Sequence, residues 1–188
     1  KYLATFTIRG DGSSKFTKGN QWGIFPSGAL AWRLSEEDFL KRDWLSNLKL
    51  RLSYGVSGNN NIPADQTGKI FSVAEQKKWL NITDTWWSAG STLNNPNLKW
   101  ESTYSANIGL DFGFFNNKLN GSVDLYKNTT KDLLMQFTIS GSGYNTQYRN
   151  IGETENKGLE VTLNYVPLQK KDYGLNFSLV LGLSLIHI

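Results

Sequence analysis

The stretch Thr103-Tyr-Ser-Ala-Asn-Ile-Gly-Leu-Asp-Phe-Gly-Phe114 decides the fold. Its odd positions hold only Thr, Ser, Asn, Gly and Asp. Its even positions hold the apolar side chains Tyr104, Ala106, Ile108, Leu110, Phe112 and Phe114. A repeat of two is typical of a β-strand with one apolar and one polar face, and no helix would separate the residues in this way.

The same alternation recurs along the chain. It is strong at residues 48–57, 158–165 and 175–183, and weaker at residues 2–9, 29–34 and 119–125. The strand that begins at residue 119 is expected to continue as far as Phe137, with faltering alternation at residues 128–131 that a bulge or the emergence of the strand above the lipid could explain. The sequence therefore predicts an all-β chain of about seven antiparallel strands.

The connections between these strands differ in length in a regular way. Asn116-Asn117 and residues 167–173 are short, whereas residues 58–99 form a long polar insertion. Short turns on one side and long loops on the other are typical of outer-membrane barrels. The sequence thus favours a segment of a transmembrane β-barrel with long external loops and short periplasmic turns. The single helical candidate is residues 35–41, with Ser35 as its cap.

Composition excludes several classes of function. There is no cysteine, and the one histidine, His187, lies next to the end, so thiolate or histidine metal sites and Ser-His-Asp catalysis lack their central residue. The 20 Lys and Arg against 16 Asp and Glu give a net charge of +4 without a long run of one sign, which argues against nucleic-acid binding. We expect no metal, no cofactor and no enzymatic activity.

Six motifs in order resemble SusC/RagA-type TonB-dependent outer-membrane transporters. They are Arg9-Gly-Asp-Gly-Ser-Ser-Lys-Phe16, Trp22-Gly-Ile-Phe-Pro-Ser27 with Trp32-Arg-Leu-Ser-Glu-Glu-Asp-Phe39, Leu48-Lys-Leu-Arg-Leu-Ser-Tyr-Gly-Val-Ser-Gly-Asn59, Asn95-Pro-Asn-Leu-Lys-Trp-Glu101, Tyr126 with Thr130-Lys-Asp-Leu-Leu134, and Asn150-Ile-Gly152 with Asn156-Lys-Gly-Leu-Glu160. Residues 1–183 are interpreted as part of such a barrel. Ser184-Leu-Ile-His-Ile188 does not resemble the family and is interpreted as a truncation or a cloning scar.

The resemblance implies a roughly 22-stranded barrel with a plugged lumen, of which this chain is about a third. It also implies a Gram-negative outer membrane, contact with its lipid, and import of large nutrients, with oligosaccharide favoured over peptide. The implied partners are a SusD-like surface lipoprotein that acts as a lid, and TonB, which acts through an N-terminal region that this chain lacks.

Two sets of residues are candidates for contacts. Trp79, Trp86, Trp87 and Trp100 lie in or beside the long insertion and suit stacking on sugars or docking of a partner. For any single tryptophan, packing within the loop or anchoring at the lipid interface is the favoured alternative. The polar positions of the strands place six further residues toward the lumen, where we expect plug contacts first: Arg51, Asn107, Asp111, Asp124, Glu160 and Asn164.

Two alternatives stay open on the sequence. The first is a soluble β-sandwich that binds carbohydrate through its tryptophans. The second is a glycoside hydrolase fragment built on paired carboxylates, from Glu36, Glu37 and Asp38 or from Glu153 and Glu155. The sandwich requires the leucine rows to meet across a buried interior, and the hydrolase requires carboxylates that face each other across a cleft.

Overall fold

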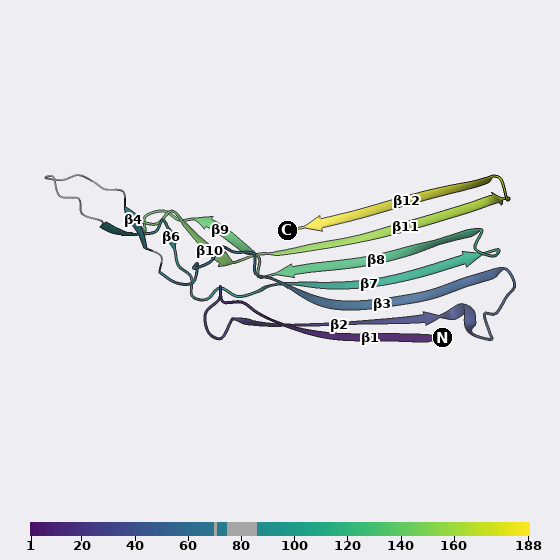
Figure 1. The fold of residues 1–188 in the computed structure, drawn as a ribbon, viewed down its shortest axis with the longest axis horizontal. Coiled ribbons are helices and arrows are strands. Elements are labelled where there is room, and N and C mark those ends of the chain that lie inside the picture. Colours follow the sequence, from purple (N-terminus) through teal and green to yellow (C-terminus); the bar gives the residue numbers. More distant parts are fainter. Residues whose placement is uncertain (70, 75–85) are drawn as a thin grey trace.

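The computed structural model describes residues 1–69, 71–74 and 86–188, and these residues form an all-β chain. Figure 1 shows long strands that run side by side, with the small strands of the two longest connections gathered at one end. The elements are β1 (Tyr2–Gly12), β2 (Trp22–Arg33), the short helix η1 (Leu34–Glu36), β3 (Leu45–Asn59), β4 (Phe71–Ala74), β5 (Trp86–Ala89), β6 (Thr92–Leu93), β7 (Glu101–Phe114), β8 (Leu119–Lys131), β9 (Leu134–Thr138), β10 (Thr146–Asn150), β11 (Glu153–Gln169) and β12 (Gly174–His187).

Seven long strands make one open sheet in the order β1-β2-β3-β7-β8-β11-β12. Every neighbouring pair is antiparallel. Because β4, β5 and β6 belong to the insertion between β3 and β7, the order of the sheet follows the order of the chain. The antiparallel architecture expected from the sequence is confirmed.

The register sorts the two faces of this sheet cleanly. One row of directly opposed residues crosses all seven strands and is apolar throughout: Ala4, Leu30, Leu52, Ile108, Leu125, Leu159 and Leu183. Leu52, Ile108 and Leu125 are 40%, 53% and 53% exposed, so no other described part of the chain covers this face. The leucine rows therefore do not meet across an interior, and the β-sandwich alternative is wrong.

Of the four buried hydrophobic side chains in the described residues, three lie in the connections between the long strands and one, Phe25, is on β2. Phe16, Ile62 and Leu98 are 1%, 3% and 0% exposed, and Trp100, Leu134 and Tyr148 pack against them; we call these six residues the loop core. The segments that supply them come from the β1–β2, β3–β7 and β8–β11 connections. Two small sheets, β6-β10-β9 and β4-β5, are formed within the last two of these connections. These small sheets lie at one end of the large sheet, which we call the loop end (Figure 1); the opposite end is the turn end.

The opposite end of the sheet carries the β2–β3 connection, residues 34–44, and the two short turns after β7 and β11. Phe115, Asn116 and Asn117 all have a positive φ, between 52° and 62°, and they reverse the chain between β7 and β8. Asparagine tolerates this left-handed conformation better than most residues, which explains the Asn-Asn pair in the turn.

The helix expected over residues 35–41 is not formed. Only the three residues of η1 are helical, and the residue that precedes them is Arg33, whose side chain makes no capping hydrogen bond. Glu36 instead pairs with Arg33, and Glu37 receives a hydrogen bond from Trp32. Because these acidic side chains bind Arg33 and Trp32 at the end of β2, they do not stabilise a longer helix.

The strand that begins at residue 119 also differs from the expectation. β8 ends at Lys131, Asp132 has a φ of 57°, and β9 then pairs with β10 in a separate sheet. The chain therefore leaves the large sheet before Phe137. At the far end β12 continues to His187, which is opposite Glu155; the assignment of residues 184–188 to an artefactual tail stays a prediction. No described helix is long and apolar enough to cross a membrane.

Candidate functional site

The polar face of the sheet holds all six residues that the alternation places toward the lumen. Arg51 is opposite Gly109, Gly109 is opposite Asp124, and Asp124 is opposite Glu160. Directly opposed residues of an antiparallel pair point to the same side, so this row faces away from the leucine row next to it. Asp111 lies two residues from Gly109 toward the turn end and Asn107 two residues toward the loop end, so both are on the same face as this row.

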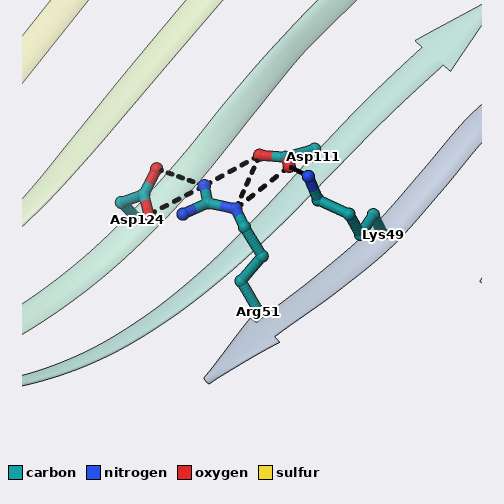
Figure 2. Close-up of polar contacts among 4 residues, drawn as sticks. All are labelled: Lys49, Arg51, Asp111 and Asp124. Carbon is teal, nitrogen blue, oxygen red and sulfur yellow. Dashed lines mark hydrogen bonds and ion pairs between the residues drawn. The ribbon is translucent and has the colours of Figure 1, made fainter. Parts of the chain in front are cut away.

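Arg51 is the centre of an ion network on this face (Figure 2). Its Nε donates to both carboxylate oxygens of Asp111 at 3.0 Å, and one terminal nitrogen donates to Asp111 Oδ1 at 2.7 Å. The same terminal nitrogen donates to both oxygens of Asp124 at 3.0 Å. The Arg51, Asp111 and Asp124 side chains are 35%, 22% and 17% exposed, so the network is partly shielded from water.

A glycine makes this network possible. Arg51 lies on β3 and Asp124 on β8, so their contact must pass over β7. Gly109 occupies the intervening position of β7, where an added Cβ would lie 2.7 Å from the guanidinium carbon of Arg51 and would collide with Asp124 Oδ1. The missing side chain of Gly109 is what lets the two charged groups meet.

Lys49 completes the network, and the lumen set expected from the sequence does not include it. Its Nζ lies 2.9 Å from Asp111 Oδ2, so two cations balance two carboxylates. Lys49 is directly opposite Asp111. The sequence does contain a signal for Lys49: it is two residues before Arg51 in the alternating strand, so both occupy polar positions on the same face.

The other predicted lumen residues lie outside the network. Glu160 is exposed and adjoins Asp124 on the neighbouring strand. Asn164 donates to Asn120 Oδ1 at 3.3 Å and accepts from Ser178 at 2.7 Å. Asn107 lies opposite Ser53 and Tyr126. Contact of these residues with a plug stays a prediction.

The carboxylates are not arranged as the hydrolase alternative requires. Asp111 and Asp124 are on one wall and share one guanidinium, so they do not face each other across a cleft. The pairs named from the sequence bind cations: Glu36 binds Arg33, Glu37 binds Lys1, Glu153 lies beside Lys131, and Glu155 binds Lys127 and Lys157. In the described part of the chain, no group of three or more His, Cys, Asp or Glu residues could hold a metal ion.

The four tryptophan candidates have different positions. Trp79 lies outside the described residues. The backbones of Trp86 and Trp87 are on β5, opposite Ala74 and Val73. Trp100 packs in the loop core, with ring centroids 5.6 Å from Phe16 and 5.5 Å from Phe25, and its Nε1 donates to Gln21 O at 3.2 Å. Trp100 thus matches the packing alternative.

Polar contacts join the loops around this core. Asn20 Nδ2 donates to Leu98 O at 3.2 Å, Thr17 Oγ1 to Pro96 O at 2.7 Å, and Asn95 Nδ2 to Tyr148 O at 2.9 Å. Thr17 and Pro96 are 79 residues apart in the sequence, and Asn95 and Tyr148 are 53 residues apart. The three connections therefore form one packed unit at the loop end.

Aromatic side chains gather at the turn end of the sheet. Phe112 stacks on Phe114 at 5.6 Å, and Trp44 lies 5.7 Å from Phe114. At the edge, Tyr2 stacks on Trp32 at 5.9 Å. Clusters of this kind at the ends of an apolar band are typical of the interfacial girdles of membrane barrels.

A two-faced antiparallel wall with a charged network on its polar face and long loops at one end defines a class of protein. The family described as "TonB dependent receptor-like, beta-barrel" matches residues 1–185, and the chain belongs to this family. The TonB-dependent receptor SusC of Bacteroides thetaiotaomicron is 44% identical over 183 residues, which are 95% of this chain. The TonB-dependent receptor P3 of Formosa agariphila is 40% identical over 190 residues, again 95% of this chain.

Solved structures agree with this assignment. The RagAB peptide importer in its closed-closed state matches 98% of this chain with a TM-score of 0.88 and 31% identity, and in its open-open state with a TM-score of 0.85 and 30% identity. The chain spans 18% of the length of SusC and of P3, and 20% of the matched RagAB chain. What is described here is therefore a segment of barrel wall with its loops.

Proposed function

We propose that this chain is part of an outer-membrane active transporter that imports large nutrients, with oligosaccharide as the favoured substrate. The observation that carries the proposal is the two-faced sheet: an uncovered apolar row crosses all seven strands, and the next row holds the Arg51 network. An apolar outer face suits lipid, and a polar inner face suits a lumen through which hydrated solutes pass.

The proposed partners follow from the family and from the loop end. A SusD-like surface lipoprotein would contact the packed loops as a lid, with Trp86 and Trp87 as contact candidates. Gating would be driven by TonB acting on a plug in the full-length protein. In this scheme the Arg51 network and its polar neighbours contact the plug or line the path that opens when the plug moves.

Peptide is the second candidate substrate. It is favoured by the likeness to the RagAB peptide importer at 31% identity. Oligosaccharide is favoured here because the long insertion is rich in Trp and Asn, and aromatic faces beside amides suit sugar rings.

Uptake by the intact transporter tests the proposal. The strain that encodes the protein, and a strain with the gene deleted, are given labelled neutral hexasaccharides of glucose, xylose or mannose, or labelled hexapeptides. We expect saccharide uptake that requires the gene and stops when the membrane is de-energised. Gene-dependent uptake of peptide alone would transfer the proposal to the peptide class, and uptake that ignores the gene would overturn it.

A further inference from the structure

A polar hollow of about 410 Å³ opens on the inner face of the sheet, on the loop side of the ion network. Tyr126, Asn107, Asn128, Asn156, Ser105 and Glu160 line it. Tyr126 is two residues beyond Asp124 along β8, so the hollow begins about 7 Å nearer to the loops than the network. A solute that enters from the loop end meets this hollow first.

The position of the Tyr126 ring is set by another glycine. Tyr126 on β8 is directly opposite Gly158 on β11. An added Cβ at Gly158 would collide with the hydroxyl end of the Tyr126 ring, so the ring occupies the space that a side chain at position 158 would fill. Gly158 thus lets the ring lie over β11 and form part of the floor of the hollow.

The polar groups around the ring suit an uncharged ligand rich in hydroxyls. Asparagine amides donate and accept hydrogen bonds, serine does the same, and the Glu160 carboxylate accepts them. Asn156 Oδ1 already accepts from Ser184 Oγ at 2.8 Å, so the Asn156 amide offers its Nδ2 donor to a ligand. A pyranose ring offers hydroxyl groups at its rim and a less polar C–H face, which packs on an aromatic ring. An anionic ligand would meet Glu160 and gain nothing from the network, whose two cations are already paired with Asp111 and Asp124.

A peptide backbone finds less to bind here. Extended peptides are commonly recognised by adding a strand to a free sheet edge. β7 and β8 are interior strands, each bonded to a neighbour on both sides, and β11 is bonded to β8 and β12. Their backbone groups are therefore engaged at the hollow, and only side chains are left to bind a ligand.

We infer that this hollow is a sugar-binding subsite of the inner wall, where Tyr126 stacks on a pyranose ring and the amides of Asn107, Asn128 and Asn156 bind its hydroxyls. The inference rests on the proposed function, because it assigns a place in the wall to the substrate class of the transporter.

Uptake kinetics of the full-length transporter test this subsite. Tyr126→Ala is expected to raise the KM for the transported hexasaccharide roughly two- to tenfold, the effect of losing one aromatic contact, while Tyr126→Phe keeps a KM near that of the wild type. Tyr54→Ala is the matched control, since Tyr54 is 54% exposed on the opposite, apolar face of the same sheet. Folding of each variant is checked by the heat-dependent shift of its electrophoretic mobility.

The outcomes separate this inference from the proposed function. If the wild type imports no saccharide, the proposed substrate class fails and the subsite fails with it. If the wild type imports saccharide and Tyr126→Ala has an unchanged KM, the subsite alone is wrong. Equal losses in Tyr126→Phe and Tyr126→Ala would overturn stacking. If Tyr126→Ala does not fold, Asn128→Ala tests the subsite in its place. A raised KM for the hexasaccharide is expected, and an unchanged KM would contradict the subsite.

Discussion

Arg51 neutralises two carboxylates that come from two different strands, so its side chain joins β3, β7 and β8 across the polar face of the sheet. Replacing it with alanine leaves Asp111 beside Lys49 alone and leaves Asp124 without a described cation. We expect Arg51→Ala to lower the free energy of unfolding by roughly 1–3 kcal/mol, a range that allows for the partial exposure of the network.

Unfolding of the full-length protein in lipid vesicles by urea measures this loss. Lys49→Ala is the control, because it removes one contact to Asp111 and leaves both carboxylates bound to Arg51. The double variant Arg51→Ala with Asp124→Asn should recover part of the stability, since no unpaired charge then faces the wall. Equal stability of Arg51→Ala and the wild type would contradict the role given to this network.

Glu37 provides a pH-dependent contact at the turn end. The Trp32 indole donates to its carboxylate at 3.0 Å and the Lys1 ammonium lies 3.2 Å away, and together they lower the pKa of Glu37 below its usual range. A lowered folded-state pKa means that the contact stabilises the fold above the pKa of the unfolded chain and is lost as the pH falls through the folded value.

Comparison of Glu37→Gln with the wild type checks this expectation. The wild type should be the more stable at pH 7, and the difference between the two unfolding midpoints should shrink as the pH falls below about 4. A difference that stays constant from pH 7 to pH 3 would show that ionisation of Glu37 contributes nothing.

Two neighbouring residues of β3 test which face of the sheet contacts lipid. Leu52 belongs to the apolar row near the middle of the strand, and Ser53 is on the polar face. Leu52→Lys should destabilise the inserted barrel by about 2–4 kcal/mol, as expected for a lysine near the bilayer midplane, and Ser53→Lys by much less. Equal effects in vesicle unfolding experiments would reject the assignment of faces.

The loop core is an element of a different kind, because its residues are buried against protein. Leu98 is 0% exposed and packs with Phe16 and Ile62. Leu98→Ala should destabilise the packed loops locally by about 2–5 kcal/mol and speed their cleavage by protease, with the strands still protected. Leu52→Ala is the control, and it should leave loop cleavage unchanged.

Sequence alone predicted the strands and their faces well, because alternation depends only on adjacent residues. The leucine rows lie on one face of the sheet and the six polar residues on the other, as the alternation predicts, and the orientation of the polar face toward a lumen stays a prediction. Cross-strand register depends on turns and on the long insertion, so the sequence did not show that Gly109 lets Arg51 reach Asp124 or that Tyr126 lies over Gly158. The expected helix failed because Glu36 and Glu37 bind partners at the end of β2 and at Lys1.

The behaviour of the whole 188-residue chain follows from its open sheet. β1 and β12 each have one edge that no described strand covers, and the apolar face carries many exposed large side chains. Exposed edges and large apolar patches promote association. We expect the isolated chain to aggregate without detergent, and a monodisperse preparation in plain buffer, measured by light scattering, would contradict this.

The loop core draws its three buried residues from two separate connections, and its packed neighbours Leu134 and Tyr148 from a third. It can close only after three hairpins have taken their places beside one another. Resistance of these loops to an added protease therefore reports when assembly of the wall is complete. A wall with one hairpin misplaced is cleaved in its loops, and the completed wall is not.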